Sequence, residues 1–167
     1  ADVELRQLYA RFLLSHNEYD LAVKQFEALH DMEPGNQAQV FANAMALLEN
    51  EQVTAAKNFL EELVGTDYQQ DEVFFFLGRI DEVQEQFANA IGWFKKVAQG
   101  ERLIESKMRI GGLYFDQGQY NQGMQWFAQV RDEHPEVRSR VYLVESEFLR
   151  ESGQYQRAYD LLSQAAV

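Results

Sequence analysis

Residues 103–135 read LIESKMRIGGLYFDQGQYNQGMQWFAQVRDEHP and contain the pattern that decides the fold. Within this stretch a small residue, Gly123, is followed four positions later by a large apolar one, Phe127. The pairing recurs along the chain at intervals of 33 to 35 residues, as Ala22 with Phe26, Ala56 with Leu60, Ala90 with Phe94, and Ala158 with Leu162. A recurrence near 34 residues is typical of a helical repeat array.

Each period is expected to form two helices joined by a short polar turn. In the first period, the second helix is indicated by apolar residues with the spacing of one buried helix face, namely Tyr19, Ala22, Val23, Phe26 and Leu29. A preceding helix is indicated by Leu5, Leu8, Tyr9, Phe12 and Leu13. The small residue then allows two helices to approach closely, while the large residue reaches toward the next repeat.

Composition limits the function classes that need to be considered. The chain has 167 residues, no cysteine and a net charge of −12. The charge disfavours nucleic acid as a partner, because nucleic-acid binding depends on lysine and arginine at the phosphates. No apolar run is long enough to span a membrane, so we expect no membrane contact by this segment.

The fourth period is similar to the tetratricopeptide repeat (TPR) in its residues Ile110-Gly111, Tyr114, Gly118-Gln119-Tyr120, Gly123, Phe127, Val130 and Pro135. The resemblance implies an all-α fold, a right-handed α-solenoid of about five tandem helix-turn-helix repeats. Their approximate ranges are 2–35, 36–69, 70–102, 103–135 and 136–167. Since neither end carries a polar capping element, we interpret the chain as a single solenoid segment of a longer protein. The uncapped terminal repeats leave self-association open.

Four stretches resemble periplasmic TPR lipoproteins of proteobacteria, namely Leu77-Gly78-Arg79-Ile80, Trp93-Phe94-Lys95-Lys96-Val97, Met108-Arg109-Ile110, and Leu149-Arg150 with the nearby Tyr155-Gln156-Arg157-Ala158. That family includes adaptors that deliver substrates to a carboxyl-terminal processing protease. The resemblance implies an adaptor in a bacterial envelope complex, periplasmic or anchored to the outer membrane. A cytoplasmic location stays open, because a chain without cysteine fits either compartment.

The sequence contains no arrangement of residues that predicts catalysis. His16, His30 and His134 are far apart, and no metal-ligand spacing or nucleophile motif is present. We therefore expect a non-enzymatic protein without cofactor or metal. A helical-repeat RNA-binding module and a regulatory segment of a larger enzyme are the alternatives.

The TPR resemblance implies that first helices line a concave groove that holds a protein or peptide partner. The groove residues that it implies are Arg11, Phe41, Met45, Phe75, Arg79, Met108, Phe115, Leu143 and Arg150. The carboxylate clamp of one TPR subset is not expected, since its positions hold Gln7, Arg11, Ala42, Glu72 and Phe76, of which one is cationic. An apolar or mixed segment is the expected ligand.

Three features have two interpretations each. In Phe74-Phe75-Phe76, either Phe75 anchors a ligand in the groove, or all three rings are shared between adjacent repeats. Trp93 and Trp126 either pack in the core or between repeats, or contact a partner. Asp81 occupies a usually apolar position and is either buried with a partner or, as we expect, at least partly solvated.

Overall fold

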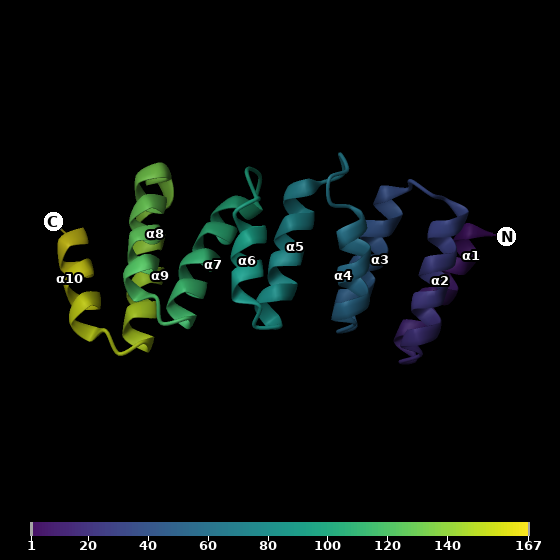
Figure 1. Ribbon diagram of the computed structural model, residues 1–167, viewed down its shortest axis with the longest axis horizontal. Coiled ribbons are helices and arrows are strands. Elements are labelled where there is room, and N and C mark those ends of the chain that lie inside the picture. Colours follow the sequence, from purple (N-terminus) through teal and green to yellow (C-terminus); the bar gives the residue numbers. More distant parts are fainter. Residues whose placement is uncertain (1, 167) are drawn as a thin grey trace. The chain divides into compact units, whose positions relative to one another are not determined.

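The computed structural model describes residues 2–166, and every regular element within that range is helical (Figure 1). This confirms the predicted all-α fold. The elements are α1 (Val3–Ser15), α2 (Tyr19–Met32), α3 (Gln37–Glu49), α4 (Val53–Glu62), α5 (Gln70–Val83), α6 (Phe87–Phe94), α7 (Arg102–Asp116), α8 (Tyr120–Glu133), the short 3-10 helix η1 (Pro135–Val137), α9 (Arg138–Glu151) and α10 (Tyr155–Ala165).

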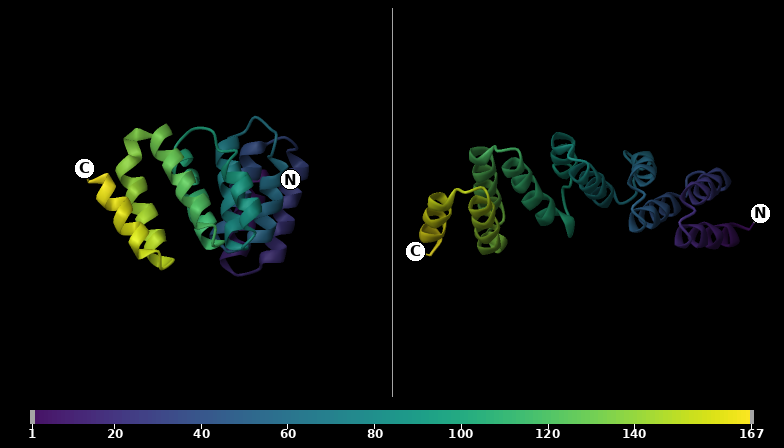
Figure 2. Two further views of the ribbon diagram at one scale, coloured as in Figure 1. Left: turned by 60° about the vertical axis from the view of Figure 1, so that its left-hand side comes forward. Right: turned by 90° about the horizontal axis from the view of Figure 1, so that it is seen from below.

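The helices form two compact units, with the boundary between Ile80 and Asp81 inside α5. In the first unit, α1 packs against α2 and α3 packs against α4. Figures 1 and 2 show α1 and α3 on one side of this unit and α2 and α4 on the other. In the second unit, α7 packs against α8 and α9 packs against α10.

The turn inside each helix pair has the same backbone geometry. The N–H groups of Glu18, Gln52, Gln86, Gln119 and Gln154 each donate to the carbonyl oxygen five residues earlier, at distances of 2.7–2.9 Å. The residue before each donor has a positive φ, and these residues are Asn17, Glu51, Glu85, Gly118 and Gly153. This is the Schellman arrangement, which ends a helix by satisfying its last carbonyl groups. The five turns therefore join the paired helices in one way.

The recurring small residues lie where helices meet. Ala22, Ala56 and Ala90 are fully buried, and a Cβ atom added to Gly123 would come within 2.5 Å of the Phe115 ring. The large residues Phe26, Leu60, Phe94 and Phe127 are also buried. In the last period, Ala158 is half-buried and Leu162 is 40% exposed, because no described helix follows α10 to cover it.

The expectation that Asp81 is partly solvated is wrong. Asp81 is 1% exposed, and its Oδ2 accepts a hydrogen bond from Nε1 of Trp93 at 3.0 Å. Trp126, the equivalent residue one repeat later, donates from Nε1 to the carbonyl oxygen of Lys107 at 2.6 Å. Both indoles therefore bond to the first helix of their own pair, which supports the structural interpretation of the two tryptophans.

Candidate functional site

A groove of about 430 Å³ lies between the first helices α1 and α3. It brings together two of the groove residues predicted from the sequence, Arg11 and Met45. The other residues that line it are Leu14, Ser15, Ala42, Ala46, Glu49 and Asn50. All of them belong to the first unit.

The groove exists because α3 presents small side chains toward α1. Ala42 and Ala46 are four residues apart and therefore lie on one face of the helix. Met45 is half-buried beside them, and its flexible thioether side chain can adapt to different apolar ligands. At the end of α3, the Asn50 side chain donates from Nδ2 to the Ala46 carbonyl oxygen at 2.8 Å, which fixes the last turn of the helix.

Charged groups of both signs lie at the groove. Arg11 and Glu49 are exposed, and neither forms an ion pair with any residue in the range 2–166. The groove therefore offers an apolar floor, one cation and one anion.

Phe41 precedes these groove residues on α3 and belongs to a cluster of aromatic rings. Its ring centroid is 5.8 Å from that of Tyr68 and 6.1 Å from that of Phe76. Phe41, Phe74 and Phe76 are half-buried, whereas Phe75 is 1% exposed. Phe76 of the triplet therefore packs against Phe41.

The other residues expected in the groove differ in how far their side chains are exposed. Phe75, Met108 and Phe115 are 1%, 7% and 4% exposed, so they belong to the hydrophobic core and offer no free surface to a ligand. Met108 and Phe115 are members of one cluster in the second unit with Phe127, Val130, Val141, Leu149 and Leu161. Exposed positions are held by Leu143 and Arg150 on α9, while Arg79 on α5 is half-buried.

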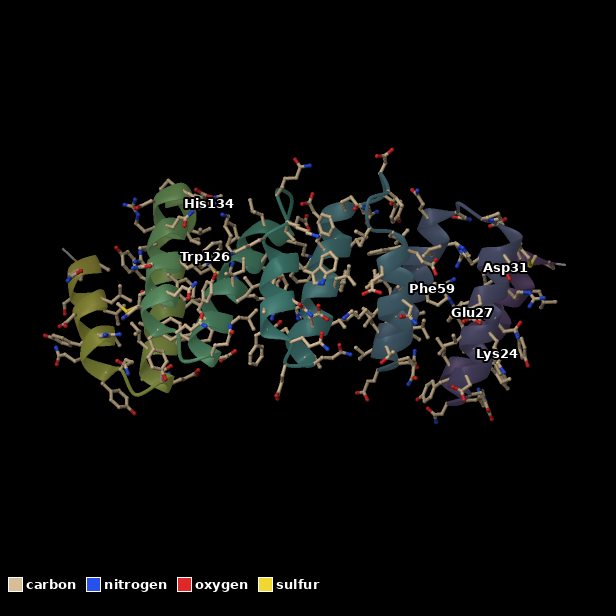
Figure 3. The ribbon with its side chains drawn as sticks, viewed as in Figure 1. Lys24, Glu27, Asp31, Phe59, Trp126 and His134 are labelled. Atoms are coloured by element: carbon tan, nitrogen blue, oxygen red, sulfur yellow. The ribbon has the colours of Figure 1, made fainter. Side chains whose placement is uncertain are left out.

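A cluster of lysines and aromatic rings in the second unit was not predicted from the sequence. The Nζ atoms of Lys95 and Lys107 lie 5.6 and 5.7 Å from the centroid of the Trp126 ring. Trp126 is labelled on α8 in Figure 3. Lys95 also donates to the Tyr114 hydroxyl at 3.3 Å. Lys107 pairs with Glu133 at 2.8 Å, and this hydrogen bond is the main reason that the pKa of Glu133 is lowered. The two lysines therefore approach the indole from the turn after α6 and from α7.

The described residues, 2–166, contain no group of three or more potential ligands that could hold a metal ion. The three histidines have separate surroundings: His16 lies against the Phe12 carbonyl, His30 is 3.8 Å from Glu62, and His134 is 3.2 Å from Glu136. Within the same range, no helix has the length and apolar character required to cross a membrane.

Comparisons with known proteins connect the chain to TPR proteins. No family model matches it. The chain is 29% identical over 94 residues to a TPR repeat-containing protein of Pseudomonas aeruginosa; the match covers 56% of this chain and 16% of that protein. The chain thus spans about a sixth of the length of this curated relative.

Two solved structures have a similar fold over nearly the whole chain. The crystal structure of MamA aligns with a TM-score of 0.70 and 14% identity, covering 98% of this chain and 89% of MamA. YrrB, described as a TPR protein with an unusual peptide-binding site, aligns with a TM-score of 0.64 and 17% identity, covering 98% of this chain and 84% of YrrB. With its 34-residue periodicity and paired helices, the chain has a TPR-like helical-repeat fold.

Proposed function

We propose that this chain is a non-catalytic protein-interaction scaffold that binds a peptide segment of a partner in the groove between α1 and α3. The observation that carries the proposal is the meeting of Arg11 and Met45 at one groove in the first unit. The peptide-binding site reported for YrrB supports peptide recognition by this fold, although that site belongs to YrrB.

The groove chemistry defines the partner segment. An apolar side chain would pack on Met45, Ala42 and Ala46, and an acidic group of the peptide would pair with Arg11. We propose Phe41 and Arg79 as further contacts on the first unit, and Leu143 and Arg150 as contacts on the second. Phe75, Met108 and Phe115 are left out of the proposed contacts because their side chains are buried.

The TPR fold supports a scaffold rather than the two alternatives. The net charge of −12 opposes an RNA-binding module. A regulatory segment of a larger enzyme would depend on a catalytic domain beyond these residues. More specifically, we propose that the chain is an adaptor in a bacterial envelope complex. It is supported by the resemblance to periplasmic TPR lipoproteins and agrees with the bacterial origin of the Pseudomonas relative.

A peptide selection tests the proposed groove. A random 12-residue phage-display library would be panned on the chain, and the most enriched peptide would be synthesised with a fluorophore for anisotropy measurements. We expect Met45→Glu to weaken its binding at least about tenfold, because a charge replaces the apolar contact. Arg11→Glu should weaken the binding of any acidic peptide.

Leu21→Glu provides a matched control, because Leu21 is an exposed leucine on α2 that does not line this groove. Thermal melts of all variants would show that the fold is retained. The proposal would be wrong if no peptide were enriched above an unrelated protein, or if the enriched peptides bound Met45→Glu as tightly as the unchanged chain.

A further inference from the structure

A second groove lies on the other side of the first unit, along the second helices α2 and α4. Two cavities of about 600 and 180 Å³ open there. They share the lining residues Val23, Glu27, Ala55 and Asn58, so the two form one continuous groove. In Figure 3, Lys24, Glu27 and Asp31 follow one another along α2, and Phe59 lies on the neighbouring α4.

The lining of this α2/α4 groove is strongly acidic. It includes five carboxylates and one lysine, Lys24; the carboxylates are those of Asp20, Glu27, Asp31, Glu51 and Glu62. All five are exposed at their positions on the two helices and the turn before α4. Asp20, Glu27, Asp31 and Glu51 form no ion pair with any other residue in the range 2–166, and Glu62 has only His30 at 3.8 Å. The groove thus concentrates negative charge that the described part of the chain leaves largely uncompensated.

Between the carboxylates the groove has an apolar surface. Val23 and Ala55 are half-buried and line both cavities, while Phe59 is buried beneath one of them. Lysine and arginine side chains match such a surface, because their methylene stems pack on apolar groups while their charged ends reach acidic ones.

The fold itself does not require these charges. Glu27 follows the buried Phe26. At the same repeat position the second repeat has Glu61, and the later repeats have Lys95, Ala128 and Ser163. A lysine or an alanine is therefore compatible with this position of the helix pair. The acidic lining is a particular property of the first unit.

We propose that the α2/α4 groove binds an extended partner segment that carries several lysines or arginines. Asp20 and Asp31 are 11 residues apart on α2, or about 16 Å at the rise of an α-helix. Five or six residues of an extended chain cover about the same distance. Basic residues at alternate or every third position of such a segment would meet Asp20, Glu27 and Asp31 in turn. This surface is distinct from the α1/α3 groove of the proposed function.

Fluorescence anisotropy with a defined basic peptide tests the proposal. The probe is fluorescein-labelled (Lys-Ala)₄, with (Glu-Ala)₄ as the acidic comparison, in 50 mM and 300 mM NaCl. We expect saturable binding of the basic peptide only, weakening as salt is raised. The variant Glu27→Gln/Asp31→Asn should bind it about three- to tenfold more weakly, since two charge contacts are lost.

The matched control is Glu61→Gln/Asp67→Asn, which removes the same charge from two exposed residues outside the groove. Binding by this control should equal that of the unchanged chain. The proposal is overturned if the control loses as much affinity as the groove variant, because net charge alone would then explain the binding. It is also overturned if the basic peptide does not bind saturably. Met45→Glu in the α1/α3 groove should leave the basic peptide unaffected, so failure of one proposal can be told from failure of the other.

Discussion

The ring of Phe127 packs directly on the backbone of Gly111. A Cβ atom added at Gly111 would lie 2.3 Å from Cζ of Phe127, well inside van der Waals contact. The Phe115 ring lies against Gly123 in the same way, since a Cβ atom added there would be 2.5 Å from Cε2 of Phe115. In the pair formed by α7 and α8, each helix thus presents a glycine to a phenylalanine of the other, and this reciprocal contact sets how closely the two helices pack.

Replacing Gly111 by alanine should destabilise the protein. The added methyl group must displace a fully buried ring, and overpacking of this kind costs about 1–3 kcal/mol. Gly92 is the control, since it lies inside α6 with nothing within 4 Å of its would-be Cβ. Gly92→Ala should stabilise by about 0.5–1 kcal/mol through helix propensity. Urea denaturation would measure both, and equal effects of the two substitutions would contradict the close contact.

The hydrogen bond from Trp93 to Asp81 should contribute more to stability than the bond from Trp126 to Lys107. The first has a buried carboxylate as its acceptor, whereas the second ends on a neutral carbonyl group. Trp93→Phe should therefore lower the free energy of unfolding by about 1–3 kcal/mol from the lost hydrogen bond, and Trp126→Phe by about 0.5–1.5 kcal/mol. The loss of ring area is common to both variants. Denaturation curves that ranked the variants in the opposite order would refute the argument.

The buried ion pair between Arg131 and Glu145 should make stability depend on pH. Burial raises the pKa of Glu145 above its ordinary value of 4.5, although the hydrogen bond and charge of Arg131 oppose the shift. Folded protein therefore holds this proton more tightly than unfolded protein does. The resulting stabilisation of the folded state is complete below pH 4.5 and is lost as the pH rises through the raised pKa of Glu145. The free energy of unfolding then falls by at most about 1.4 kcal/mol per pH unit.

Glu145→Gln isolates this effect, because the amide cannot titrate. The stability difference between the unchanged chain and Glu145→Gln should fall as the pH is raised from 4 through the Glu145 transition. Glu147→Gln, an exposed neighbour on α9, should show no such trend. Urea midpoints measured at several pH values provide the comparison. A difference that stayed constant from pH 4 to pH 8 would rule out a raised pKa at Glu145.

The repeat pattern predicted the helix pairs because four of the five small and large pairs are buried at helix contacts with the same spacing. The direction of individual side chains on the first helices was harder to predict. These helices are covered from two sides, so the periodicity of Phe74, Phe75 and Phe76 does not show which ring faces the core. Asp81 was misjudged because its partner Trp93 lies 12 residues away on another helix.

The two grooves differ in how far the sequence could predict them. Arg11 and Met45 followed from the TPR register, since that register fixes which residues of successive first helices are neighbours. The α2/α4 groove was missed because its carboxylates occupy exposed positions, where the repeat imposes no pattern. Only the packing of α2 beside α4 brings Glu27, Asp31 and Glu62 to one surface.

Apolar side chains are exposed on α1 and α10, and from them we predict head-to-tail association of two copies. Leu5, Tyr9 and Phe12 on α1 are 64%, 48% and 56% exposed. The equivalent residues of α5, 68 positions later, are all buried, namely Val73, Leu77 and Ile80. On α10, Leu162 occupies the position of the buried Phe26, and Tyr155 and Tyr159 are exposed beside it. Within residues 2–166, no helix covers either face, and we predict that the α10 face of one copy packs on the α1 face of another.

Paired variants distinguish this arrangement from a symmetric dimer. We expect Tyr9→Glu/Phe12→Glu and Tyr159→Glu/Leu162→Glu to sediment as 19.4 kDa monomers when each is alone, because each retains only one of the two complementary faces. An equimolar mixture should form a dimer of twice that mass and stop there, since both remaining outer faces carry charges. The unchanged chain should form larger species as its concentration rises. Dimers of either variant alone would indicate a symmetric contact instead, and a mixture that stayed monomeric would show that these faces do not bind each other.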